Sequence, residues 1–149
     1  MKNSQYEEFD QLLTEGENAR RARHFEDCIR AYDRALALYR GEFMQGSYEP
    51  WVEEQRTYYR EQYLRLLEAL AGVAQTATDW PKVMHLAQLI IRDDQLREDI
   101  HCMIMRAQAA MGNRGAVKEH YEGLKRLLAS ELGCEPSLET RKLYRELIG

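Results

Sequence analysis

Hydrophobic side chains recur every three or four residues along most of the chain. That spacing is typical of amphipathic helices, because one helical turn takes about 3.6 residues. Residues that commonly cap or break helices separate the periodic segments, among them Asp79 before Trp80, the pair Gly112-Asn113, and Ser137. The pattern predicts about seven helices, over residues 6–23, 26–40, 50–76, 80–93, 97–111, 114–131 and 138–147.

The fourth and sixth predicted helices repeat one pattern at an interval of 34 residues. The aligned pairs are Trp80 and Arg114, Val83 and Val117, Ala87 and Tyr121, and Ile90 and Leu124. Thirty-four residues is the period of the tetratricopeptide repeat, a helix-turn-helix unit whose copies stack to bury a shared core. The sequence therefore predicts an all-α fold, a tetratricopeptide-like right-handed stack of antiparallel helical hairpins.

The first predicted hairpin fits the same template through its small and aromatic positions, which are Gly16, Phe25, Cys28, Tyr32 and Ala35. Cys28 precedes Val83 by 55 residues, and the excess over one repeat coincides with a predicted loop over residues 41–50 and with the long third helix. The repeats are degenerate. The template has a glycine or alanine in the first helix of each repeat, and this position is Gly16, then Ala71, but Met105 in the last copy. No proline closes a repeat.

Composition and charge narrow the classes of function. The 149 residues suit one domain, and 21 Lys and Arg against 25 Asp and Glu give a net charge of -4, which does not favour broad binding of a phosphate backbone. Three cysteines without a CxxC pair indicate neither a disulfide framework nor a zinc finger, so a reducing cytoplasm fits best. No apolar run approaches the roughly 18 residues of a membrane span, and no export signal is visible.

The sequence contains no recognisable catalytic or metal-binding motif. GxSxG, the P-loop, GxGxxG and HExxH are all absent, and the four histidines at positions 24, 85, 101 and 120 are isolated along the chain. We interpret these histidines as surface or helix-packing residues, and Cys28 as a buried thiol. The chain is therefore expected not to be an enzyme and to need no cofactor or metal.

Half of the aromatic residues lie near the predicted long loop. They include five that could form an interaction patch, Phe43, Tyr48, Trp51, Tyr58 and Tyr59. The favoured interpretation is a satellite core that holds the loop against the third helix, and the alternative is an exposed surface for a partner. Tyr58 and Tyr59 cannot face one direction on a helix, so at least one of them should face solvent.

Charged residues suggest a second candidate surface. Stacked repeats would line a concave groove with their first helices, and the 34-residue register places six charged side chains near it, Arg20, Arg65, Arg106, Asp10, Glu68 and Asp99. Such a mixed groove could hold a peptide or a neighbouring helix. The remaining arginines of the first hairpin are interleaved with acidic residues, and a solvated face is favoured there over a nucleic-acid contact.

Several short motifs occur in a specific order along nearly the whole chain. They are Leu38-Tyr39-Arg40-Gly41-Glu42-Phe43, then Gly46, Trp51, Arg56, Tyr63 and Leu67, then Leu96-Arg97-Glu98-Asp99, then Tyr121 with Leu124, and finally Glu131-Leu132-Gly133-Cys134-Glu135-Pro136-Ser137 with Thr140 and Tyr144. In this combination the chain resembles the bacterial transcriptional activator domain, the tetratricopeptide-like effector domain of SARP-type regulators and related transcription factors.

The resemblance implies a regulatory domain that works through protein contacts. In that family the domain follows an N-terminal winged helix that binds DNA, and this chain begins where the effector domain would begin, so the winged helix is expected upstream of it. The implied partners are other domains of the same regulator, a second copy in a homodimer, and RNA polymerase subunits; DNA would be bound mainly by the missing domain. The alternative is a generic tetratricopeptide scaffold or peptide sensor unrelated to transcription.

Overall fold

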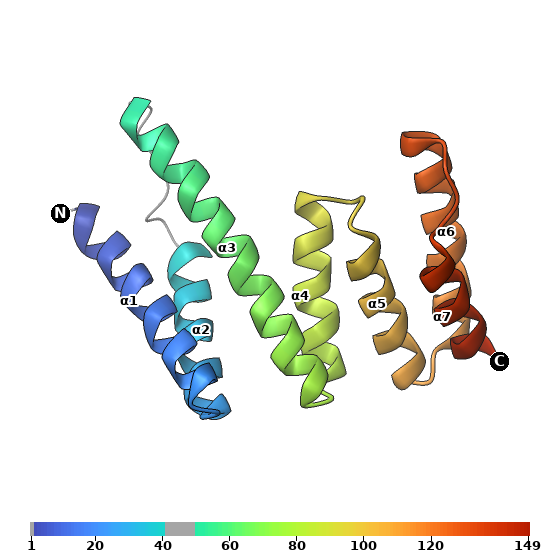
Figure 1. Cartoon of the computed structure of the whole chain (residues 1–149), viewed down its shortest axis with the longest axis horizontal. Helices are drawn as coiled ribbons and strands as arrows, with labels where there is room; N and C mark the ends of the chain where they lie inside the picture. Colours follow the sequence, from blue (N-terminus) through green and yellow to red (C-terminus); the bar gives the residue numbers. More distant parts are fainter. Residues whose placement is uncertain (1, 41–49) are drawn as a thin grey trace. The chain divides into compact units, whose positions relative to one another are not determined.

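The chain folds into α-helices throughout the part that the structure describes. The computed structural model describes the main chain at residues 2–40 and 50–149, and the side chains at residues 6–39 and 54–149. These residues form seven helices and no strand (Figure 1), which are α1 (Lys2–Arg21), α2 (Phe25–Arg40), α3 (Pro50–Thr76), α4 (Trp80–Asp93), α5 (Glu98–Ala110), α6 (Arg114–Leu132) and α7 (Leu138–Ile148). The predicted all-α fold is confirmed, and the largest difference in a boundary is the start of α1 at Lys2 instead of residue 6.

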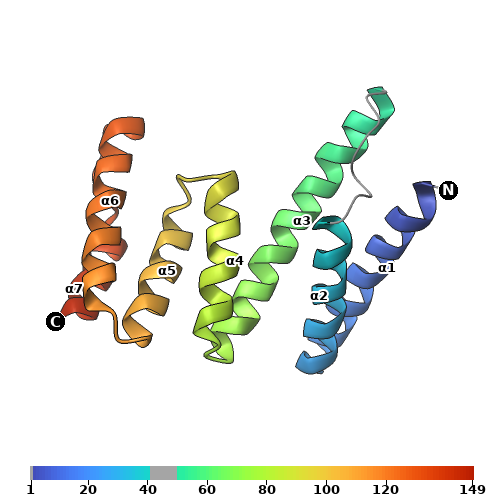
Figure 2. The same ribbon diagram turned by 180° about the vertical axis from the view of Figure 1, so that it is seen from behind.

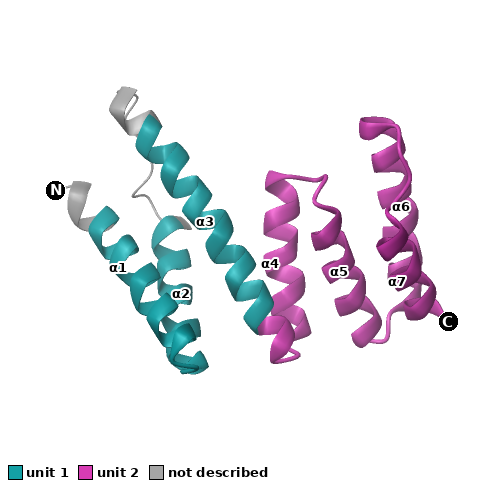
Figure 3. Cartoon of the chain, viewed as in Figure 1, with its two compact units in different colours: residues 1–73 teal, residues 74–149 magenta. Residues whose placement is uncertain are grey.

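The chain divides into two compact units, residues 1–73 and residues 74–149 (Figure 3). The boundary falls inside α3. The predicted loop over residues 41–50, with the cap at Gly41, lies almost entirely outside the described residues.

In the first unit, α1 and α2 form a hairpin with a tight turn at residues 22–24. Arg23 adopts a left-handed conformation with φ of 62°, and the His24 amide donates to the Ala19 carbonyl at 2.8 Å. The helices approach closely because Gly16 has no side chain: a Cβ atom there would lie 2.2 Å from Cε1 of Tyr32. Phe25 was expected to pack between these two helices. That expectation is wrong, because Phe25 is the first residue of α2 and is 48% exposed.

In the second unit, four caps set the helix boundaries. The side chains of Asp79, Asn113 and Ser137 accept amide hydrogen bonds at the starts of α4, α6 and α7, and Gly133 ends α6 in a left-handed conformation with φ of 62°. The successive helices α4, α5 and α6 pack in pairs, and α7 lies against both α5 and α6 (Figure 2). The N-cap residues at Asp79 and Ser137 were predicted from the sequence.

Burial follows the repeat register read from the sequence. Three sets of positions separated by 55 and then 34 residues are all buried, namely Cys28, Val83 and Val117; Tyr32, Ala87 and Tyr121; and Ala35, Ile90 and Leu124. Cys28 is fully buried, as expected. The degenerate 34-residue period therefore marks real core positions of a tetratricopeptide-like fold.

Candidate functional site

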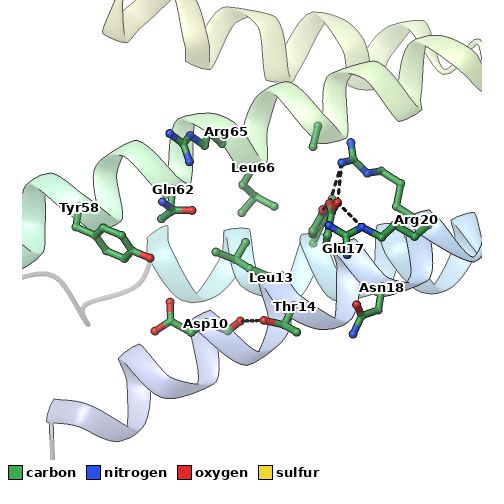
Figure 4. Close-up of a pocket in the computed structure, with 13 residues that line it drawn as sticks. Asp10, Leu13, Thr14, Glu17, Asn18, Arg20, Tyr58, Gln62, Arg65 and Leu66 are labelled. Atoms are coloured by element: carbon green, nitrogen blue, oxygen red, sulfur yellow. Dashed lines mark hydrogen bonds and ion pairs between the residues drawn. The ribbon is translucent and has the colours of Figure 1, made fainter.

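The first unit contains an open cavity between α1 and α3 with a volume of about 590 Å³ (Figure 4). Its lining is mainly polar and charged, with Asp10, Thr14, Glu17, Asn18, Arg20 and Arg21 from α1, Tyr32 from α2, and Tyr58, Gln62 and Arg65 from α3, and the apolar remainder is Leu13, Leu66 and Ala69. An open cavity with both signs of charge suits a polypeptide segment better than an apolar small molecule.

Aromatic packing holds the two walls of this cavity together. The ring of Tyr59 on α3 packs edge-on against Phe9, with 5.6 Å between ring centroids, and also against Tyr6 at 4.8 Å. Its hydroxyl donates to a carboxylate oxygen of Asp10 at 2.9 Å. Burial, together with that hydrogen bond, raises the pKa of Tyr59 well above its usual value. Tyr59 therefore stays a neutral donor that fixes Asp10 at the edge of the cavity.

Glu17 is the centre of a charge cluster on α1. It accepts hydrogen bonds from Arg20 at 2.8 and 3.0 Å, forms an ion pair with Arg21 at 3.3 Å, and accepts from the Tyr32 hydroxyl at 3.3 Å. The hydrogen bond from Arg20 is the main reason that the pKa of Glu17 is lowered. Burial raises the pKa of Tyr32 to about 12. Arg20 and Arg21 thus share one carboxylate within α1.

The third arginine, Arg65, lies on the α3 wall and is exposed. It forms no ion pair with any residue whose side chain the structure describes. Arg65 is therefore available to an incoming carboxylate, next to the polar side chains of Gln62 and Tyr58.

The six charged residues predicted to line one groove divide between the two units. Asp10, Arg20 and Arg65 line the cavity of the first unit, whereas Glu68 is half-buried on α3 and is not among the side chains described around that cavity. Asp99 and Arg106 line a smaller cavity of about 280 Å³ in the second unit. One continuous groove through all six stays a prediction.

The predicted aromatic patch is described only in part. Phe43, Tyr48 and the side chain of Trp51 lie outside the described residues. Tyr58 is 50% exposed and lines the charged cavity, while Tyr59 is 7% exposed and belongs to the core. The expectation that the two tyrosines face different directions is confirmed.

Two of the sequence motifs meet in the second unit. The Glu98 carboxylate, at the start of α5, accepts the Ser137 amide at 2.8 Å and the Thr140 hydroxyl, and Cys102 Sγ lies 3.3 Å from that hydroxyl. Burial alone would raise the pKa of Glu98, but the hydrogen bonds from Thr140 and Ser137 outweigh it and the pKa is lowered. Within the motif over residues 96–99, Arg97 donates two hydrogen bonds to the carboxylate of Asp99, at 2.9 and 3.0 Å.

This network shows that the motif residues serve the fold. Glu98 ties the N-terminus of α7 to α5, because it takes an amide hydrogen bond that the helix cannot satisfy internally. Glu98 and Ser137, one from each motif, are therefore explained by helix capping and packing.

One cluster was missed by the reading of the sequence. His101 and His120, which were taken as isolated, lie in contact, with 2.8 Å between Nδ1 of His101 and Nε2 of His120. Their contact agrees with the interpretation of these histidines as helix-packing residues, but the sequence did not indicate the pairing, which arises because α5 and α6 are neighbours and bring positions 19 residues apart together. No spacing rule for a single helix could have indicated the pair.

The described side chains include no group of three or more His, Cys, Asp or Glu positioned to hold a metal ion. Among the helices that the structure describes, none combines the length and the hydropathy needed to cross a bilayer.

Comparison with known proteins supplies the family context. A family model described as the bacterial transcriptional activator domain matches residues 6–148. The chain is 28% identical over 140 residues to the regulatory protein AfsR of Streptomyces coelicolor, and this alignment covers 92% of the chain and 14% of AfsR. The chain thus spans a small part of that relative.

A solved structure shares the fold. The structure of Mycobacterium tuberculosis EmbR in complex with a low affinity phosphopeptide matches with a TM-score of 0.71 and 21% identity, over 99% of this chain and 40% of that one. At this level of identity the likeness concerns the fold alone. It supports the tetratricopeptide-like arrangement that the 34-residue period predicted.

Proposed function

The chain belongs to the bacterial transcriptional activator domain family, and we propose that this transcription regulator domain acts through contacts with other proteins or with other domains of its regulator. It acts in the cytoplasm, and DNA is contacted mainly by an upstream winged-helix domain. The match over residues 6–148 removes the support for a scaffold unrelated to transcription.

The observation that carries the proposal is the charged cavity between α1 and α3. Its acidic groups and two of its arginines are already engaged, whereas Arg65 is a cation without an ion pair in the described part of the chain. A partner carboxylate that pairs with Arg65 would gain a charge-assisted hydrogen bond without breaking an existing ion pair. A polypeptide segment that crosses the cavity could also contact the exposed ring of Tyr58.

The partners proposed for this surface are a second copy of the chain, a neighbouring domain of the same regulator, and subunits of RNA polymerase. Protein partners are in keeping with EmbR, whose solved complex contains a phosphopeptide. Asp99 and Arg106, at the smaller cavity of the second unit, are proposed as additional contacts.

Light scattering on the 149-residue chain measures self-association, and capture of purified bacterial RNA polymerase by the immobilised chain measures the second interaction. We expect at least one of the two to be detected. If the chain is monomeric and captures no polymerase, a second copy and RNA polymerase are both excluded as partners.

Charge reversal then locates the surface. Arg65→Glu should weaken the detected association by roughly tenfold or more, because an attraction becomes a repulsion. Arg34→Glu is the matched control, since Arg34 is an exposed arginine of α2 that does not line the cavity and the net charge changes equally. Arg106→Glu tests the second unit in the same way. Unchanged association for Arg65→Glu would show that the cavity is not the contact surface.

A further inference from the structure

The charged cavity between α1 and α3 is elongated along both helices. Its lining on α1 runs from Asp10 to Arg21, and its lining on α3 runs from Tyr58 to Ala69. Each wall therefore extends over 11 residue steps, which is about 16 Å of helix. Because an extended polypeptide advances about 3.3 Å per residue, the cavity has the length of about five extended residues.

Each wall presents a charged side chain that forms no ion pair with the described residues. Arg65 is the cation on α3, and the exposed carboxylate of Asp10 is the anion on α1. The hydrogen bond from the Tyr59 hydroxyl reaches only one of the two carboxylate oxygens of Asp10. The carboxylate keeps its charge and its second oxygen, so it can also pair with an incoming cation. The cavity thus offers opposite charges on opposite walls.

The hydrogen bond between Tyr59 and Asp10 aligns the two walls. It joins the Tyr59 hydroxyl to the Asp10 carboxylate at 2.9 Å, and Figure 4 shows Asp10 and Tyr58 toward the same end of the cavity. Arg65 follows Tyr59 by six residues, which is about 9 Å further along α3. Since three residues of an extended segment cover about 10 Å, the two charges are offset along the cavity by about three extended residues.

An extended segment can reach both charges because its side chains alternate between two sides. Residues an odd number of positions apart point in opposite directions, and residues an even number apart point in the same direction. A spacing of three positions therefore gives both the required length and one side chain toward each wall. Asn18 on α1 and Gln62 on α3 can pair with the peptide groups of the segment, since their side-chain amides have no hydrogen-bond partner among the described residues.

We propose that this cavity binds an extended polypeptide segment in which an acidic and a basic side chain are three residues apart. The acidic side chain pairs with Arg65 and the basic one with Asp10. This inference rests on the proposed function and adds the charge pattern that a partner must carry. At the other end of the cavity, Arg20 and Arg21 share the single carboxylate of Glu17, so that end disfavours the basic side chain.

The test uses the whole chain and four acetylated, amidated hexapeptides, each containing one lysine, one glutamate and four threonines. Threonine favours an extended backbone. In two peptides the charged residues are three positions apart, once in each order, and in the other two they are two positions apart, again in each order. The composition is identical, so only the spacing and direction of the charges differ. NMR chemical-shift titration of the isotope-labelled chain at low ionic strength measures binding, because salt would screen exposed ion pairs.

We expect a peptide with the three-position spacing to bind most tightly and to shift signals of the α1 and α3 residues that line the cavity. Both peptides with the two-position spacing should bind about fivefold more weakly, because they can form only one of the two exposed ion pairs. Equal binding of all four peptides, or no binding of any, would overturn the charge pattern. Self-association and polymerase capture are measured without these peptides, so failure of the pattern is distinguishable from failure of the proposed contacts.

Neutral variants test each wall separately. With Asp10→Asn, which keeps an acceptor for Tyr59, replacing the lysine of the peptide by glutamine should no longer weaken binding. With Arg65→Gln, the same should hold for replacing the glutamate by glutamine. Glu8→Gln and Arg34→Gln are the matched controls, since both residues are exposed and do not line the cavity, and sensitivity to both replacements should persist. Sensitivity that also persists in Asp10→Asn or Arg65→Gln would overturn the assigned ion pair.

Discussion

The two units place residues of equivalent repeat position in different surroundings. Gly16 and Met105 occupy the same position of the repeat, and so do Tyr32 and Tyr121. In the first unit the Tyr32 ring covers Gly16, and its hydroxyl reaches Glu17. In the second unit Met105 fills the position and is fully buried in one cluster with Tyr121.

The C-terminal helix accounts for the difference. The ring of Tyr121 stacks on Tyr144 of α7, with 3.8 Å between centroids and 4° between planes. The partly buried Leu147 and Ile148 of α7 pack on the same cluster. A large side chain at position 105 is accommodated because Tyr121 packs toward α7. The repeat register therefore determines which positions are buried, while the neighbouring helix determines the volume available to each.

The units also differ in which interactions can titrate. In the first unit, ring contacts and the Tyr59 hydroxyl join α1 to α3. The carboxylate of Glu17, whose pKa is lowered, is only partly buried. The second unit relies on a buried histidine pair and on the Glu98 carboxylate. We expect the first unit to be sensitive to added volume and the second to be sensitive to acid.

The largest effect is expected from Gly16→Ala. Its methyl group would lie 2.2 Å from Tyr32, whose ring is buried and cannot move aside without separating α1 from α2. The free energy of unfolding should fall by about 3 kcal/mol, measured by urea denaturation. Gly72→Ala is the control, since no atom beyond the neighbouring residues and the backbone of α3 lies within 4 Å of the new Cβ, and it should stabilise α3 by about 0.5–1 kcal/mol. Equal effects of the two changes would contradict the close approach.

Glu98→Ala should give the next largest loss. The change leaves the Ser137 amide and the Thr140 hydroxyl without their acceptor, which should cost about 2 kcal/mol. Hydrogen exchange should show α7 losing protection before α1 and α2. Glu98→Gln keeps an acceptor oxygen and should lose less; if both variants behave alike, the carboxylate does not hold α7.

Acid should destabilise the second unit in a definite pH range. The pKa of His120 falls from 6.5 in the unfolded chain to about 4 in the folded chain, so its contribution is complete above pH 6.5 and is lost as the pH falls toward 4. The loss should be of the order of 1–2 kcal/mol. The contribution of Glu17 disappears only below its unfolded value of 4.5, because its folded pKa is lowered from there.

Amide exchange followed from pH 7 to pH 4 measures both units in one sample. Protection in α5 and α6 should decline from about pH 6.5 downward, ahead of protection in α1 and α2. His120→Phe should remove the decline between pH 6.5 and 4. A decline that persists in this variant would assign the acid sensitivity to another group.

The smallest effect is expected from Tyr59→Phe. The ring contacts with Phe9 and Tyr6 remain, and only the hydroxyl that donates to Asp10 is lost. Thermal or urea denaturation should show a loss of about 1 kcal/mol. Tyr58→Phe alters an exposed ring and should change stability by less than about 0.5 kcal/mol. A larger loss for Tyr58→Phe would mean that its hydroxyl has a structural role.

Most of the fold could be predicted from local signals. Helix boundaries follow caps such as Asp79 and Ser137, and the buried set follows the 34-residue period, since both depend on residues close together in sequence or repeated at a fixed interval. Phe25 fits the repeat template but is not buried. It lies in the first turn of α2, where half of its surface remains exposed.

The candidate sites were predictable only in part. Asp10, Arg20 and Arg65, three of the six residues that the register grouped, line one cavity of the first unit. The pairs of Glu17 with Arg20 and Arg21 follow the i,i+3 and i,i+4 spacing of one helix, so the sequence allows them. Whether Arg65 meets an acidic side chain depends instead on which helices pack near it. Asp99 and Arg106 lie at a separate cavity of the second unit.

The sequence by itself determined the helices, their repeat and the family, because hydrophobic period, capping residues and ordered motifs are properties of the chain. Tertiary structure alone decided which polar groups meet. It brought Glu98 to Ser137 and His101 to His120, joining residues on different helices whose separations of 39 and 19 follow no helical period. Hydrogen bonds require atoms within about 3 Å, and that proximity arises only when the helices pack.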